Sequence, residues 1–204
     1  MRLFLFDVDG TLLTARGAGR VALGRALERT WGIAGPIDRY DFRGKTDPRI
    51  VVDLMREAGV PGPLVAARLR ACLEVYVQEL EALIGNGYPV RLMPGVAELV
   101  QALAESRDAL VGLLTGNIEA GARVKLGPTG LWPLFRLGAY GSDDADRNRL
   151  PAIACARGCG ATAVAVATGF HPIDDLAACQ PDLLFADFSD VAATVDALLG
   201  HDAA

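Results

Sequence analysis

Short apolar segments alternate along the chain with longer segments in which apolar residues recur every three or four positions. The first short segment, LFLF at residues 3–6, has no polar residue, which is typical of a parallel strand buried on both faces. Further short apolar segments occur within 109–117, 134–144, 161–169 and 182–190. We therefore predict that these segments form strands.

Helical spacing of apolar residues predicts helices at 20–32, 47–59, 63–85, 96–106 and 190–200. The second of these begins with Asp47, which we expect to act as its N-cap, followed by Pro48 at the first helical position. The third ends at Gly85, a residue type that commonly terminates helices.

Strands that alternate with helices indicate a parallel sheet covered by helices on both faces. The helical block at 15–91 interrupts this alternation after the first strand. We therefore expect an α/β, Rossmann-like core made of residues 1–14 and 92–204, with residues 15–91 inserted as a helical cap.

Composition narrows the class of protein. Hydrophobic residues make up 51% of the 204 residues, and the mean hydropathy is +0.28. No apolar run reaches the roughly 18 residues of a membrane helix, and the first run is too short for a signal peptide. The net charge is −5, and the chain has no basic stripe that would indicate a nucleic-acid surface. We expect a cytoplasmic protein without a nucleic-acid or membrane partner.

The cysteines do not indicate a zinc site. Cys155 and Cys159 are four positions apart, but the chain has only two histidines to accompany them. Reduced thiols in the core or on the surface are the expected state of all four cysteines.

Two acids follow the first predicted strand, in the segment DVDGTLL. Asp7 and Asp9 lie at the carboxyl end of that strand, where open α/β sheets bind their ligands. Gly10 allows the backbone to turn and a ligand to approach closely. One carboxylate can attack phosphorus while the other protonates the leaving oxygen. Because two carboxylates repel an anionic substrate, Mg²⁺ is the expected cofactor. The alternative is an ordinary Asp-Gly turn.

A second strand ends in LLTGN and predicts a phosphate-binding turn. Thr115 supplies a hydroxyl, Gly116 an unobstructed amide, and Asn117 an expected helix N-cap beside free backbone N–H groups. On its own this segment is as compatible with a plain strand-to-helix turn, but together with DVDGT it favours phosphate binding.

The pair FDVDGTLL and LLTGN, separated by a helical insertion, resembles the haloacid dehalogenase superfamily in its phosphatase branch with a helical C1-type cap. The segments MPGVAELVQAL, GARVKLG and GAYGSDDADRNRLP resemble its phosphoglycolate-phosphatase-like subgroup. The resemblance implies that Asp7 is the nucleophile and forms an aspartyl-phosphate. It implies that Asp9 is the general acid and base, and that Thr115 and Gly116 bind the phosphoryl group.

Further site residues follow from the same resemblance. The family's third motif is a basic residue that balances the charge of nucleophile and phosphate, and Arg147 is its first candidate, with Arg149 second. Thr11 and Gly10 belong to the first motif and are expected beside the phosphate. In the cap, FRGKTD resembles the segment that reaches over the site, so Lys45 and Arg43 are candidates for substrate contact.

The family's fourth motif, an apolar strand that ends in an acidic metal-binding turn, is missing between DRNRLPAIA and GATAVAVATG. The sequence reads as an internal deletion of one core strand. The segment VAVATGFHPIDDLA imitates the missing layout and would place Asp174 at the second acid, but Phe170 at the first. The predicted metal ligands are therefore Asp7, Asp9 and Asp174. Asp175, Asp143 and Asp144 are the alternative acids, which would hold the metal through water.

Three functions remain open at this stage. The first is a Mg²⁺-dependent phosphatase of a small phosphorylated metabolite. The second is a catalytically impaired relative that binds phosphate or a partner. The third is a sugar-phosphate mutase, which shares the nucleophile pair and the cap type. The sequence predicts neither the substrate nor the oligomeric state.

Overall fold

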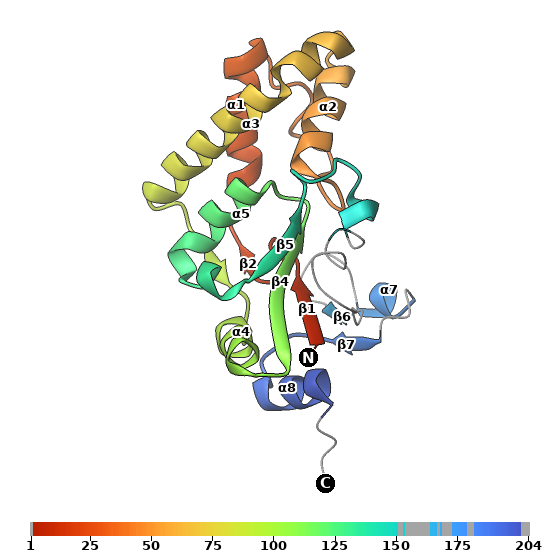
Figure 1. Cartoon of the computed structure of the whole chain (residues 1–204). Helices are drawn as coiled ribbons and strands as arrows, with labels where there is room; N and C mark the ends of the chain where they lie inside the picture. The colour runs from red at the N-terminus through yellow and green to blue at the C-terminus, as the bar shows by residue number, and fades with distance from the viewer. Residues whose placement is uncertain are drawn as a thin grey trace.

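The computed structural model describes residues 2–150, 153, 164–166, 168, 173–178 and 182–200. It has an α/β architecture in which a parallel sheet lies below a group of three helices (Figure 1). The predicted fold class is confirmed.

The central sheet contains β1 (Arg2–Phe6), β4 (Ala109–Thr115) and β5 (Leu137–Tyr140), in the order β1-β4-β5. All pairs are parallel, and Phe6 is in register with Leu113. Because parallel strands point the same way, the residues after β1 and β4 meet at one edge of the sheet.

Two smaller pairs of strands complete the described β-structure. The antiparallel pair β2 (Leu13–Thr14) and β3 (Arg91–Leu92) lies where the chain leaves for the three helices and returns from them. The parallel pair β6 (Val164–Val166) and β7 (Leu183–Phe185) forms a sheet of its own among the described residues.

Helices cover the sheets, and those at 96–105 and 191–199 lie where the apolar spacing predicts helices. The helices are α4 (Val96–Glu105), α5 (Glu119–Leu126), α7 (Ile173–Ala178) and α8 (Val191–Leu199). Short 3₁₀ turns occur at η1 (Gly127–Thr129), η2 (Trp132–Leu134) and η3 (Arg147–Arg149). In the described part of the chain, no helix combines the length and the apolar character of a membrane span.

The three helices at the top of Figure 1 are α1 (Ala18–Trp31), α2 (Asp47–Glu57) and α3 (Gly62–Gly85). Helix α1 buries a stripe with helical spacing against α3: Ala18, Ala22, Leu23, Ala26 and Leu27. Helix α3 also contacts α5, so the group is in contact with the helices of the sheet.

Two predicted helix starts are wrong by one residue. The N-cap of α2 is Thr46 and not Asp47, because the Thr46 hydroxyl accepts a hydrogen bond from the Arg49 N–H. The N-cap of α5 is Ile118 and not Asn117. The Asn117 side chain is instead hydrogen-bonded within the candidate site, as described below.

The expected absence of one core strand stays a prediction, because residues 154–163 lie outside the described part. Among the described residues, β1 pairs along one edge only, with β4. Beyond β6, the Thr168 hydroxyl donates a hydrogen bond of 2.7 Å to the carbonyl oxygen of Gly10. The end of β6 therefore contacts the loop that follows β1.

One continuous apolar cluster joins the sheet to the three helices. It includes Phe4 and Leu113 from the sheet, Leu23 from α1, and Leu80 from α3, all of them buried. The cluster continues below the sheet through Leu198 of α8. The core therefore holds the helices above the carboxyl edge of the sheet.

Candidate active site

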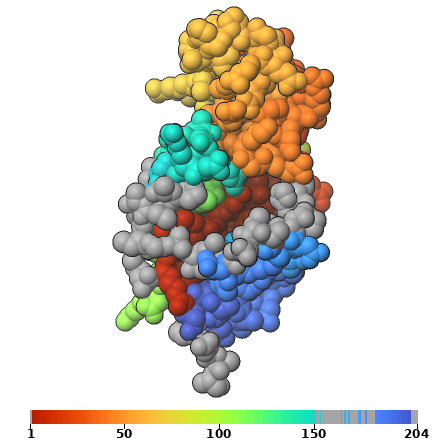
Figure 2. Space-filling model, turned by 90° about the vertical axis from the view of Figure 1, so that its right-hand side faces the viewer, coloured from red at the N-terminus to blue at the C-terminus, as the bar shows by residue number. Residues whose placement is uncertain are grey.

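A cavity of about 790 Å³ lies at the carboxyl edge of the sheet, beneath the three helices. Figure 2 shows a hollow here between the orange residues of α2 and the blue C-terminal residues, with red residues of the N-terminal segment at its floor. Segments far apart in sequence line the cavity: Asp7, Asp9–Thr11, Arg43–Lys45, Asp47, Thr115–Asn117, Lys125 and Arg147.

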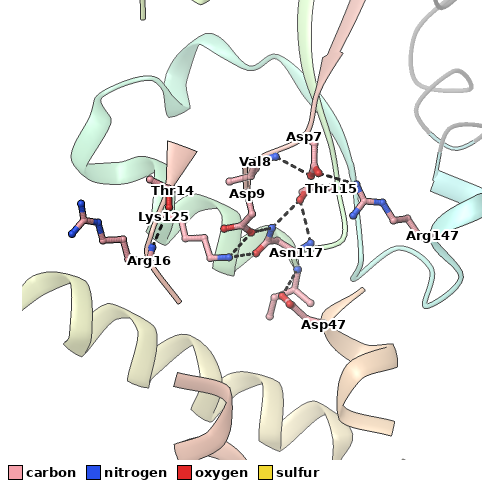
Figure 3. Close-up of polar contacts among 11 residues, drawn as sticks. Asp7, Val8, Asp9, Thr14, Arg16, Asp47, Thr115, Asn117, Lys125 and Arg147 are labelled. Atoms are coloured by element: carbon pink, nitrogen blue, oxygen red, sulfur yellow. Dashed lines mark hydrogen bonds and ion pairs between the residues drawn. The ribbon is translucent and has the colours of Figure 1, made fainter. Parts of the chain in front are cut away.

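Asp7 is the first residue after β1 and is half-buried at the floor of the cavity. One carboxylate oxygen accepts the N–H of Val8 at 2.9 Å, and the other accepts a hydrogen bond from Arg147 Nη2 at 2.9 Å (Figure 3). This ion pair fixes the direction of the carboxylate and places a guanidinium beside it at the floor of the cavity.

Asp9 is held by two donors, one from the turn after β4 and one from α5. Its Oδ2 accepts hydrogen bonds from Asn117 Nδ2 at 2.8 Å and from Lys125 Nζ at 2.6 Å (Figure 3). Burial alone would raise the pKa of Asp9, but the Lys125 ammonium and the Asn117 amide lower it below its ordinary value. Asp9 is therefore ionised at neutral pH.

Lys125 lies on α5 with only 5% of its side chain exposed. Its ammonium also donates to Asn117 Oδ1 at 2.6 Å. Burial would lower the pKa of Lys125, but the Asp9 and Asp47 carboxylates beside it raise the pKa above its ordinary value. The side chain therefore carries a fixed positive charge at the base of the site.

Thr115 and Gly116 form the turn that follows β4. The Thr115 hydroxyl accepts N–H groups of Asn117 from the backbone at 3.3 Å and from the side chain at 2.8 Å. A hydroxyl has one donor beside its lone pairs, so the O–H of Thr115 remains available for an anion. A Cβ at Gly116 would collide with the Lys45 carbonyl oxygen, so only glycine lets these two backbone segments approach.

Thr46 and Asp47, at the start of α2, make three hydrogen bonds that dock them at the site, two to residues after β4 and one to the loop after β5. The Asp47 N–H donates to the Gly116 carbonyl at 2.8 Å, and the Asp47 carboxylate accepts the Ile118 N–H at 2.9 Å. The Thr46 hydroxyl donates to the Ala145 carbonyl at 2.7 Å. Burial raises the pKa of Asp47 to about 6, although Lys125 nearby opposes the shift.

The remaining sequence candidates divide between the cavity and the surface. Gly10 has a φ of 85°, a conformation that favours glycine, and both Gly10 and Thr11 line the cavity. Lys45 lines it with its ammonium 3.9 Å from the centre of the Tyr40 ring. Arg43 also lines it, paired with Asp41.

The second candidate for the third motif lies away from the cavity. Arg149 is 72% exposed and pairs with Asp144 at 3.4 Å. Of the two candidates, the structure therefore brings only Arg147 to Asp7.

The described residues do not by themselves fit a magnesium site. No group of three or more acidic, histidine or cysteine side chains with metal-binding geometry occurs in the described part of the chain. Asp174 is exposed on α7 and does not line the cavity, and Asp143 and Asp144 line a different one. The side chain of Asp175 lies outside the described residues. Asp7 and Asp9 are the two predicted ligands at the cavity, and both are in ion pairs.

Two residues of the site were missed by the sequence reasoning. The residue pattern predicts a helix cap at Asp47, whereas its carboxylate accepts the N–H of Ile118 after β4. The pattern predicts no role for Lys125. A compositional signal marks it: lysine occurs twice among the 20 basic residues, and both lysines, Lys45 and Lys125, line this cavity.

Comparison with known proteins supports the same class of site. The chain is 30% identical over 224 residues to a phosphoglycolate phosphatase of Synechococcus elongatus, with 98% of this chain and 99% of that protein covered. Its structure resembles that of CbbY from Rhodobacter sphaeroides in complex with phosphate, with a TM-score of 0.64, 17% identity, and coverage of 94% and 96%. No family model matches the chain.

A hydrolase of the haloacid dehalogenase-like family from Streptococcus pneumoniae is also similar, with a TM-score of 0.56, 18% identity, and coverage of 96% and 98%. These two structures show a common fold, and the phosphatase sequence shows common ancestry along nearly the whole chain. The chain belongs to the haloacid dehalogenase superfamily. Within it, its place is among the relatives of phosphoglycolate phosphatase.

Proposed function

We propose that the protein is a phosphomonoester hydrolase that acts on a small phosphorylated metabolite. The observation that carries this proposal is the placement of Asp7, held by Arg147, beside the turn of Thr115 and Gly116. A nucleophilic carboxylate, a cation and a phosphate-binding turn then face one cavity. This combination is what in-line attack on a phosphate monoester requires.

The reaction proceeds in two steps in this proposal. Asp7 attacks phosphorus and forms an acyl-phosphate, while the P–O bond to the leaving group breaks. The leaving oxygen takes its proton from Asp9 in its protonated form, which is the minor form at neutral pH. Water then attacks the phosphorus of the intermediate, Asp9 takes up its proton, and phosphate leaves with Asp7 restored. The ion pair with Lys125 keeps Asp9 ionised, which favours its role as a base in the second step.

The resemblance implies Mg²⁺ as cofactor, with Asp7 and Asp9 among its ligands. Mg²⁺ usually takes one or two carboxylates together with waters and substrate phosphate oxygens. Both carboxylates are engaged by cations here, and Asp174 does not line the cavity. We therefore derive no step through the metal, and the assay below measures its effect directly.

The second candidate function is a protein that binds phosphate without turning it over. It is favoured by the lack of a third acid at the described site. It is also favoured by the alignment with the phosphatase, which runs over 224 residues and is longer than this chain of 204. Some positions of the relative therefore have no counterpart in this chain.

Hydrolysis of an aryl phosphate by the purified protein, in Mg²⁺ and in EDTA, tests the proposal. We expect turnover in the wild type and none in Asp7→Asn, because an amide cannot form the intermediate. Asp108→Asn is the matched control, since Asp108 precedes β4 at the opposite end of the sheet. Equal turnover in both variants, or none from a folded wild type, contradicts the proposal.

Substrate choice is tested with the active protein. Phosphoglycolate and hexose phosphates are compared by release of inorganic phosphate, because the matching relative is a phosphoglycolate phosphatase. Hydrolysis of either supports the proposed function. Isomerisation of a hexose phosphate without release of phosphate would indicate a mutase.

A further inference from the structure

The cavity is positively charged in a chain that is negative overall. Among the described residues that line it, six are cationic: Arg16, Arg20, Arg43, Lys45, Lys125 and Arg147. Only three are carboxylates: Asp7, Asp9 and Asp47. The whole chain carries a net charge of −5, so basic residues are concentrated here. Such a cavity attracts anions and raises their local concentration.

Each of the two aspartates at its floor already has a cation of its own. Asp7 pairs with Arg147 at 2.9 Å, and Asp9 pairs with Lys125 at 2.6 Å. Without these partners, two carboxylates would repel an incoming phosphate, which is the reason a divalent cation is expected at such a pair. The structure provides that compensation with side chains.

Lys125 is suited to this role because it is buried and its ammonium is hydrogen-bonded to two oxygen atoms. Its ammonium lies between Asp9 Oδ2 and Asn117 Oδ1, both at 2.6 Å, and only 5% of the side chain is exposed. Solvent ions screen a charge in this position weakly. Lys125 acts through Asp9 and does not need to touch the anion.

We propose that this site binds a phosphate-sized oxyanion without a divalent cation, with Lys125 and Arg147 supplying the charge that a metal would otherwise provide. The inference rests on the proposed phosphate site at Asp7, Thr115 and Gly116. It goes beyond that proposal because it assigns the charge balance to the protein's own side chains.

The scarcity of lysine makes a direct test possible. Labelling the lysine Cε carbons with ¹³C gives two side-chain signals, and Lys45→Arg identifies which of them belongs to Lys125. Inorganic phosphate is titrated into the full chain in EDTA, and then in Mg²⁺. We expect a saturable shift of the Lys125 signal in EDTA, with a dissociation constant that Mg²⁺ changes by no more than about twofold.

Calorimetry of phosphate binding in EDTA tests the two cations separately. Lys125→Met and Arg147→Met are each expected to weaken binding by about tenfold or more, since each removes a charge close to the anion. Arg107→Met, an exposed residue before β4, is the control and leaves the affinity unchanged. If Lys125→Met unfolds, Arg147→Met still decides, because Arg147 is 29% exposed at the cavity.

Binding that requires Mg²⁺ would overturn the inference, as would binding in EDTA that leaves the Lys125 signal unmoved. This failure is distinct from failure of the proposed function. Turnover in Mg²⁺ that depends on Asp7, without phosphate binding in EDTA, refutes the metal-free site and keeps the phosphatase. Phosphate binding in EDTA without turnover under any condition keeps the metal-free site and refutes the phosphatase.

Discussion

Asp47 is a carboxylate whose charge is unfavourable where it stands. Burial raises its pKa from an ordinary value of 3.8 to about 6, so the folded protein holds a proton there more tightly than the unfolded chain does. The contribution of this group to the free energy of unfolding is therefore largest below pH 4, and it is lost as the pH rises through 6. A residue retained at the expense of stability is typical of functional sites.

Replacing Asp47 by Asn is expected to stabilise the protein at pH 8 by about 1–3 kcal/mol. The amide oxygen still accepts the Ile118 N–H, but no charge is buried. Near pH 3 the difference should largely vanish, because Asp47 is then mostly protonated in both the folded and the unfolded state. Urea denaturation at the two pH values measures this, with the exposed Asp38→Asn as control. A variant that is less stable at pH 8 would contradict the stated cause of the shift.

Single residues of the site differ in how far the sequence could predict them. Asp7 and Thr115 were found because each follows an apolar strand within a short motif. Lys125 is 116 positions from Asp9, and nothing local in the sequence connects the two. Asn117 was placed at a helix cap because its type favours caps, whereas tertiary contacts with Asp9 and Lys125 decide its position.

At the scale of elements, the turn after β4 and the segment before α2 form one contact. The Gly116 backbone lies so close to the Lys45 carbonyl that no side chain fits between them. The hydrogen bond from Asp47 N–H to the Gly116 carbonyl closes the same contact. The position of the lysine over the cavity therefore depends on a glycine in another segment.

Gly116→Ala is expected to push the two segments apart. We expect a loss of about 1–3 kcal/mol in the free energy of unfolding and a clear loss of activity on aryl phosphates, because Lys45 and the Gly116 amide are both displaced. Gly127→Ala is the matched control, since a Cβ there meets nothing within 4 Å. Thermal denaturation and the phosphatase assay check both. Full activity in Gly116→Ala would show that this close approach is not needed.

Elements with a clear apolar period could be predicted, whereas some of their ends could not. The long helix α3 (Gly62–Gly85) and the strand β4 agree with the sequence pattern. The predicted N-cap of α2 is one residue too late because Thr46 and Asp47 are both residue types that favour caps. Only the hydrogen bond from the Arg49 N–H to the Thr46 hydroxyl distinguishes them. Periodicity also does not predict which strands pair. The sequence therefore did not predict that β6 and β7 pair with each other and not with β1 among the described residues.

At the scale of the whole molecule, the proposed core (1–14 and 92–204) and cap (15–91) share an apolar cluster. Leu80 of α3 and Leu113 of β4 belong to the same buried set. Parts joined in this way are expected to unfold together. The chain offers one tryptophan in each part, Trp31 in α1 and Trp132 in η2.

Single-tryptophan variants test this cooperativity. Trp31→Phe leaves Trp132 as the probe, and Trp132→Phe leaves Trp31. Trp31 Nε1 is buried without a hydrogen-bond partner in the described structure, so phenylalanine is a mild replacement there. We expect urea transitions followed by fluorescence to coincide with the transition followed by circular dichroism in each variant. A separate, earlier transition reported by Trp31 alone would show that the cap unfolds independently.

The central claim is that Asp7 carries the phosphoryl group during turnover. The most direct measurement is an acid quench during hydrolysis of an aryl phosphate, followed by mass spectrometry of the tryptic peptide at residues 3–16. Asp9→Asn is the protein to use. An aryl leaving group needs little protonation, while hydrolysis of the intermediate loses its base. The account predicts one phosphoryl group on Asp7 of this peptide, and its absence in the Asp7→Asn/Asp9→Asn double variant. A phosphoryl group on another residue, or turnover that persists in Asp7→Asn, would contradict the account.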